Sequence, residues 1–224
     1  MTTFVLVHGG FGSPAELAPV IPELEALGHR AIAVDLPCTD PAATLEGYAQ
    51  AVVDAMSGLD PPIVVVGHSA GGATISLVPD LTRVDGLAYV TAFVPEPGRS
   101  IWDVAGADVR QTILAISHDD GNGCRSFDLE LLASTVPPAE RDQYLAFLSA
   151  TQRPQGWAAM EQPWPGRSLP AVPCTYVLCS EDNVLPPATQ REMAARLGVD
   201  PVEIASDHAV FAIRPHDLAA LLVG

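Results

Sequence analysis

The stretch Ile63-Val64-Val65-Val66-Gly67-His68-Ser69-Ala70-Gly71 decides the fold. Its first four residues are apolar and of strand length, and the rest form a G-x-S-x-G motif that leads into small residues able to open a helix. A strand, a sharp turn and a helix around such a serine are typical of a nucleophile elbow. Glycines two residues on either side let the strand and the helix approach closely. We therefore predict that Ser69 is exposed above a sheet as a nucleophile.

Five further apolar runs of strand length accompany this one. Together the six runs cover residues 4–7, 31–34, 63–66, 86–90, 175–179 and 202–204. Runs that are apolar at every position suit strands buried on both faces, as in a parallel sheet covered by helices. The pattern predicts an α/β protein with right-handed crossovers.

Helical patterns lie between these runs. Leu45, Tyr48, Ala49, Val52, Val53 and Met56 share one face of an amphipathic helix. The segment Ser13-Pro14-Ala15-Glu16 resembles a capping box at the start of an earlier helix, which Pro19 and Pro22 should break or delay.

The alternation is interrupted from about residue 95 to about residue 170. This insertion lacks buried-strand runs and holds all three tryptophans, Trp102, Trp157 and Trp164. It is either an ordinary helical insertion or a cap over a cleft, and aromatic side chains gathered in one insertion favour the cap. We expect one domain over residues 1–224, with the cap at 95–170 and with Trp157 and Trp164 in the pocket wall.

The composition limits the partners and the chemistry. The chain has 224 residues and a net charge of −16, and all 11 basic residues are Arg. Such an acidic chain would be repelled by nucleic acid and by anionic membranes. The absence of Lys excludes Schiff-base and P-loop mechanisms.

The sequence also bears on where in the cell the protein is located. No apolar run reaches membrane-spanning length, and the first residues lack the basic segment of a signal peptide. The four cysteines form no C-x-x-C pair, so we expect reduced thiols and neither disulfides nor a zinc site. These features favour a cytoplasmic protein and leave the oligomeric state open.

A serine nucleophile needs a histidine base, which follows it in the chain in this type of fold. Three histidines follow Ser69, namely His118, His208 and His216. His208 lies just past the last strand-like run, where a loop reaches the edge that carries Ser69, so it is the predicted base. His118 lies in the insertion and His216 at a helix start, and both are expected on the surface.

The acid that orients the base should follow the preceding strand. The run 175–179 ends in Ser180-Glu181-Asp182, and we choose Asp182 with Glu181 as the alternative. Asp207 is adjacent to the base and badly placed to accept its ring N–H, and Asp103 is a remote substitute.

Two backbone N–H groups should stabilise the oxyanion. One belongs to Ala70, directly after the nucleophile, and the other should come from the loop His8-Gly9-Gly10-Phe11-Gly12. Gly10 is the predicted donor, and Phe11 is expected to line the pocket.

These segments resemble the α/β-hydrolase superfamily, and more narrowly its small esterases and hydroxynitrile lyases. The matching segments are residues 4–9, 28–37, 67–71, 179–182 with Pro186 and Gln190, and Asp207-His208 with Pro215 and Leu218. The resemblance covers the core and hardly touches the insertion. It implies the α/β-hydrolase fold, a Ser69–His208–Asp182 triad and a helical cap. Because the first run here matches the third strand of the family, it also implies a reduced, mostly parallel six-stranded sheet.

One departure bears on the reaction. The hydroxynitrile lyases of this group carry a lysine directly after the catalytic histidine, and this chain has Ala209 there. We therefore expect a serine carboxylesterase that cleaves a small apolar ester through an acyl-enzyme, with no metal and no cofactor. Two alternatives stay open: a ligand-binding receptor on the same fold, and a lyase or cyclase that uses the same histidine base.

Overall fold

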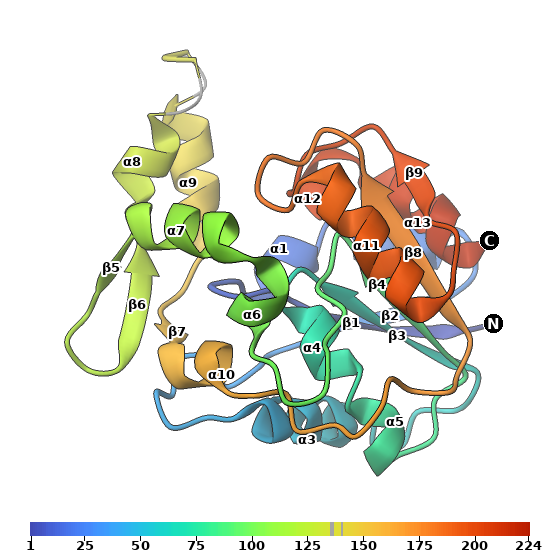
Figure 1. Ribbon diagram of the computed structural model, residues 1–224. Helices are drawn as coiled ribbons and strands as arrows, with labels where there is room; N and C mark the ends of the chain where they lie inside the picture. Colours follow the sequence, from blue (N-terminus) through green and yellow to red (C-terminus); the bar gives the residue numbers. More distant parts are fainter. Residues whose placement is uncertain (135–136, 140) are drawn as a thin grey trace.

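A six-stranded parallel sheet forms the centre of the computed structural model, which describes residues 1–134, 137–139 and 141–224 (Figure 1). The strand order is β2-β1-β3-β4-β8-β9, and every neighbouring pair is parallel. The strands are β1 (Thr3–Val7), β2 (Arg30–Val34), β3 (Ile63–His68), β4 (Gly86–Val90), β8 (Cys174–Cys179) and β9 (Val202–Ile204). All six correspond to the predicted apolar runs, which confirms the α/β-hydrolase sheet.

The central strands of the sheet are buried on both faces, which explains why they are apolar at successive positions, whereas the edge strand β9 carries the exposed Val202 and Glu203. In β1, Val5 and Val7 belong to one hydrophobic cluster while Phe4 and Leu6 belong to another. Successive side chains of a strand point to opposite faces, so each strand needs apolar residues at both sets of positions.

Helices from the two halves of the chain cover the two faces. The first cluster is closed by α3 (Leu45–Ala55), α4 (Gly71–Ile75), α5 (Val78–Leu81) and α11 (Pro187–Leu197). The second is closed by α1 (Pro14–Leu17), α2 (Val20–Ala26), α12 (Val210–Ile213) and α13 (Pro215–Val223). Helix α3 matches the predicted amphipathic stripe, and its N-terminus is capped by the Thr44 hydroxyl.

The first helical segment departs from its prediction in one respect. Pro19 separates α1 from α2, as expected. Ser13 is the N-cap of α1, but its side chain makes no capping hydrogen bond. The Glu16 carboxylate instead contacts the ring of His68, so the predicted capping box is wrong.

The insertion between β4 and β8 is not wholly helical, which corrects the prediction. It contains α6 (Ile101–Ala105), α7 (Ala107–Ala115), β5 (Ser117–Asp119), β6 (Cys124–Phe127), α8 (Leu129–Ala133), α9 (Arg141–Thr151), β7 (Gln155–Gly156) and α10 (Trp157–Glu161). The three short strands form an antiparallel sheet in the order β5-β6-β7. They span only two to four residues each and include polar ones, so they carry no apolar run. In Figure 1, α8 and α9 stand at the upper left, across from α12, and α9 contacts α1.

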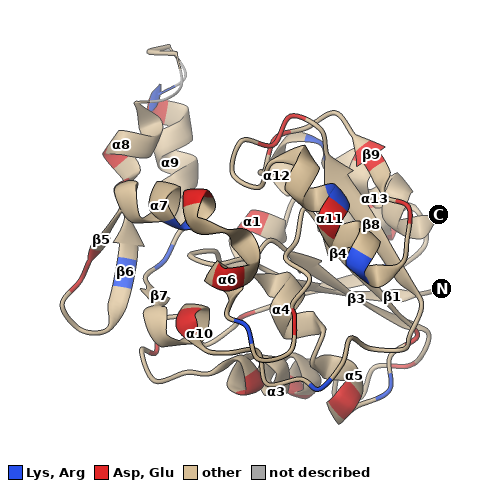
Figure 2. Ribbon diagram, in the orientation of Figure 1, with Lys and Arg blue, Asp and Glu red and all other residues tan. Residues whose placement is uncertain are grey.

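Acidic residues are distributed over the outer helices and loops, whereas the central strands carry none (Figure 2). The described part of the chain contains no helix of the length and hydropathy that a bilayer crossing requires.

Candidate active site

Ser69 lies on the turn between β3 and α4, in a strained backbone conformation. Its φ is +50°, a region that residues other than glycine seldom adopt. The turn is tight because a Cβ atom at Gly71 would lie 2.6 Å from the carbonyl oxygen of His8. A Cβ atom at Gly67 would lie 2.9 Å from the side chain of Ile75. The glycines of the motif thus allow the close approach that the sequence predicts, and strained turns of this kind are concentrated at functional sites.

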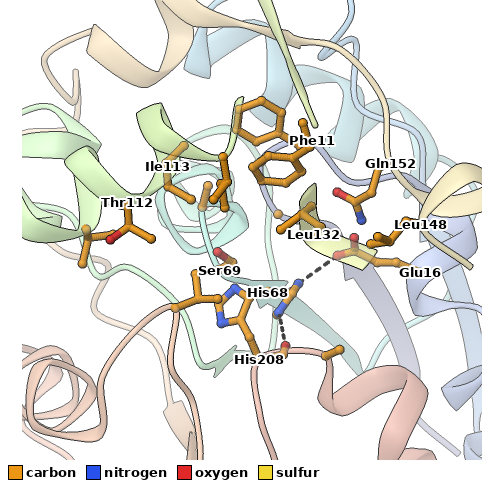
Figure 3. Close-up of a pocket in the computed structure, with 18 of the residues that line it drawn as sticks. Phe11, Glu16, His68, Ser69, Thr112, Ile113, Leu132, Leu148, Gln152 and His208 are labelled. Atoms are coloured by element: carbon orange, nitrogen blue, oxygen red, sulfur yellow. Dashed lines mark hydrogen bonds and ion pairs between the residues drawn. The ribbon is translucent and has the colours of Figure 1, made fainter. Parts of the chain in front are cut away.

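Loops after two neighbouring strands bring His208 and Asp182 together. His208 follows β9 and Asp182 follows β8, and His208 Nδ1 is 2.7 Å from Asp182 Oδ2. The Asp182 side chain is fully buried, whereas 20% of the His208 side chain is exposed. In Figure 3 the His208 ring lies next to the Ser69 side chain, and both residues line the same cavity.

A set of donors fixes the Asp182 carboxylate. Its Oδ1 atom accepts hydrogen bonds from the N–H groups of Val184 at 2.7 Å and Leu185 at 2.8 Å. Its Oδ2 atom accepts from the Thr91 hydroxyl at 2.5 Å as well as from His208. Burial alone would raise the pKa of Asp182, but the hydrogen bond and charge of His208, together with the other donors, hold that pKa below its usual value. The carboxylate is therefore ionised at neutral pH and able to orient the imidazole.

The alternative acids and bases lie away from this arrangement. Glu181 and Asp207 are exposed, and Asp207 accepts from the backbone N–H of residue 209. Asp103 is also exposed and caps the start of α6. His118 and His216 are exposed and pair with surface carboxylates.

Gly10 and Ala70 lie against each other beside Ser69. A Cβ atom at Gly10 would be 3.7 Å from the Cβ atom of Ala70. Within residues 1–134, 137–139 and 141–224, neither backbone N–H has a hydrogen-bond partner, so both are open to a ligand. The Phe11 N–H, in contrast, donates to the Gln155 side chain at 3.2 Å.

A cavity of about 200 Å³ opens above Ser69 and His208. Its wall is mainly apolar and comes from the loop after β1, from the insertion and from α12. Phe11 lines it, as expected, and stacks on Phe127 with ring centroids 4.0 Å apart. Figure 3 shows Ile113 of α7 on one side of the cavity and Leu148 of α9 on the other.

The tryptophan in the wall is Trp102, so the placement of Trp157 and Trp164 in the wall is wrong. Trp157 packs behind Trp102 with ring centroids 5.0 Å apart. Trp164 is buried, and its indole N–H donates to the carbonyl of Ala73 at 3.0 Å. The positions of the tryptophans in the sequence place them in the insertion but do not show which of its faces they occupy.

Two titratable residues with largely buried side chains in the cavity lining were not expected from the sequence. Glu16 comes from α1 and His68 from the end of β3, and their side chains are 2.8 Å apart. His68 directly precedes Ser69, the predicted nucleophile, and this position was a signal that could have singled it out. Among the described residues, no group of three or more His, Cys, Asp or Glu is arranged to hold a metal ion.

The parallel sheet, the serine turn and the histidine–carboxylate pair define an α/β hydrolase. The chain matches the alpha/beta hydrolase family over residues 4–221 and belongs to it.

Several relatives are esterases and hydrolases. A pyrethroid hydrolase of Sphingobium wenxiniae is 30% identical, with 98% of this chain and 85% of that protein covered. Methylesterase 3 of Arabidopsis thaliana is 27% identical, with 98% and 94% covered. The crystal structure of a pyrethroid hydrolase from Sphingobium faniae has a TM-score of 0.77 and 27% identity, with 99% and 96% covered.

Proposed function

We propose that the chain is a serine carboxylesterase that cleaves a small, largely apolar ester through an acyl-enzyme. One observation carries the proposal: the 2.7 Å contact between His208 and the buried Asp182, in the cavity that Ser69 enters from its strained turn. The family membership and the names of the relatives support the hydrolysis of an ester.

The mechanism assigns each residue a separate task. Ser69 Oγ attacks the ester carbonyl while His208 Nε2 takes its proton, and His208 then returns that proton to the leaving alcohol. Asp182 holds Nδ1–H and stabilises the imidazolium. The N–H groups of Gly10 and Ala70 bind the oxyanion. A water molecule activated by His208 then hydrolyses the acyl-enzyme.

The cavity supports the substrate class. About 200 Å³ suits a small ester, and the wall is mainly apolar. No Arg occurs among the described residues that line it. A substrate with its own carboxylate or phosphate would therefore be disfavoured.

The test is hydrolysis of p-nitrophenyl esters of increasing acyl length by the wild type, Ser69→Ala and His208→Ala. Ser57→Ala changes an exposed serine and is the matched control. We expect turnover by the wild type and the control, with both site variants reduced by about 10³-fold or more. The proposal fails if Ser69→Ala retains more than about a tenth of the wild-type kcat.

A further inference from the structure

A second carboxylate–imidazole pair lies next to the first. Glu16 Oε1 is 2.8 Å from His68 Nδ1, and His68 Nε2 is 3.0 Å from the carbonyl oxygen of His208 (Figure 3). We propose that Glu16 and His68 are positioning residues that hold the His208 loop and so keep its imidazole aligned between Asp182 and Ser69. This inference rests on the proposed function, in which His208 is the base.

The contacts of His68 link four parts of the fold. The side chains of His68 and Glu16 are only 8% and 12% exposed. The His68 ring lies 4.8 Å from the ring of His208 and 5.3 Å from that of Phe211, measured between centroids. Helix α1, strand β3, the loop after β9 and helix α12 therefore meet at one imidazole.

The absence of side-chain capping at the start of α1 supports a functional role for the Glu16–His68 pair. In a capping box Glu16 would reach back to the backbone N–H of Ser13, and the serine hydroxyl would cap α1. Here Glu16 is hydrogen-bonded to His68, and among the described residues the buried Ser13 Oγ has no hydrogen-bond partner. A broken local rule of this kind is expected at a functional site.

The two hydrogen bonds fix the positions of the protons. A carbonyl oxygen only accepts, so His68 Nε2 must carry a proton. A second proton is shared between Nδ1 and the Glu16 carboxylate. Whichever of the two holds it, the pair is neutral overall and His68 donates to the His208 loop.

The electrostatics favour the ion-pair form. Burial lowers the pKa of His68, but the hydrogen bond and charge of Glu16, with smaller contributions from the His208 carbonyl and Asp182, raise it above its usual value. Burial raises the pKa of Glu16, but the His68 hydrogen bond and charge, with His8 nearby, lower it below its usual value. Arg153, next to His8, is a further charge on that side.

A pH dependence follows from these directions. The pair is intact below the raised pKa of His68 and loses the shared proton as the pH rises through that value. A neutral His68 would then place its one proton toward the Glu16 carboxylate, leaving Nε2 bare against the His208 carbonyl. We expect the hold on the loop, and with it kcat, to weaken at high pH.

Glu16 has two roles: it is the hydrogen-bond partner of His68 Nδ1, and it shares a proton with that atom. Substitutions at Glu16 separate these two roles. Glu16→Met keeps the length but leaves His68 Nδ1 without a partner. Glu16→Gln places an amide that can donate to Nδ1, so Nε2–H remains on the His208 carbonyl and no shared proton is left to lose. The matched control is Glu23→Gln, which changes a partly exposed carboxylate 3.0 Å from His216 Nδ1.

Kinetics of p-nitrophenyl ester hydrolysis across pH, with thermal unfolding to check folding, test the proposal. We expect Glu16→Met to lower kcat by about 10- to 100-fold with little change in KM, as displacement of a reacting group does. Glu16→Gln should recover most of kcat near neutral pH and lose the decline at high pH. Glu23→Gln should match the wild type. A folded Glu16→Met with kcat within about twofold of Glu23→Gln and an unaltered pH profile overturns the proposal.

Nitrogen-15 NMR of the imidazole rings supplies a readout that needs no turnover. The pair predicts that the imidazole resonances of His208 change position in Glu16→Met but not in Glu23→Gln, because only the former removes the hydrogen bond that orients the His68 ring against the His208 loop. Unchanged His208 resonances in Glu16→Met contradict the inference. If the wild type hydrolyses no ester, the proposed function fails while the NMR comparison still decides the role of the pair.

Discussion

Replacement of Asp182 by Asn should invert the tautomer of His208. The Oδ1 position accepts from the N–H groups of Val184 and Leu185, so the amide oxygen of Asn must occupy it. The amide NH₂ then faces His208 Nδ1 at the position now 2.7 Å away. Because NH₂ only donates, Nδ1 must accept, and the ring proton moves to Nε2, where it blocks removal of the Ser69 proton.

The size of this effect follows from how firmly the carboxylate is held. The N–H groups of Val184 and Leu185 oppose a flip of the Asn amide. The Asp182 side chain is fully buried, so no water molecule can take over its hydrogen bond to His208. We expect kcat to fall by about 10⁴-fold, as in the serine protease triad, which corresponds to about 5 kcal/mol in the barrier.

The assay is p-nitrophenyl butyrate hydrolysis with the active-site concentration measured by phosphonate titration. Glu181→Gln is the matched control because it changes the exposed neighbouring carboxylate, and it should leave kcat within about twofold. A kcat for Asp182→Asn within about tenfold of the wild type, or a larger loss in Glu181→Gln, would refute the tautomer argument.

Three other predictions concern the turn, the wall and the reaction. Gly71→Ala places a Cβ atom 2.6 Å from the His8 carbonyl, so the free energy of unfolding should fall by about 1–3 kcal/mol in urea denaturation. Gly47→Ala, in α3, places a Cβ atom at an ordinary contact distance of 3.7 Å from the Thr44 hydroxyl and should instead be neutral or stabilising. Trp102→Ala enlarges the cavity, so KM should rise for short acyl esters and the preference should move to longer ones; an unchanged ester series would exclude Trp102 from the substrate wall. Cyanide release from an aromatic cyanohydrin should stay at the Ser69→Ala level, since Ala209 offers no cation to the leaving cyanide, and release at a rate rivalling ester hydrolysis would favour a lyase.

The sheet was predictable because its central strands are buried on both faces. Val5 and Leu6 face opposite clusters, so the central strands carry uninterrupted apolar runs that no surface strand would show. The short strands of the insertion, such as β7 with Gln155 and Gly156, lack this property and were missed.

The candidate site was predictable as far as chain order and glycines determine it. The G-x-S-x-G motif identified Ser69, and the loops after the last two strands supplied His208 and Asp182, which the structure brings together. Contacts between segments that lie far apart in the chain could not be predicted from the sequence. Nothing local in the sequence says that Glu16 turns from its helix toward His68.

Covalent labelling would show whether Ser69 is the nucleophile without depending on the choice of substrate. The intact chain would be treated with a fluorophosphonate, digested and analysed by mass spectrometry, with Ser69→Ala treated in parallel. We expect one adduct per chain, on the peptide containing Ser69, and no comparable labelling of Ser69→Ala. An adduct on another residue, or equal labelling of the two proteins, would contradict this expectation.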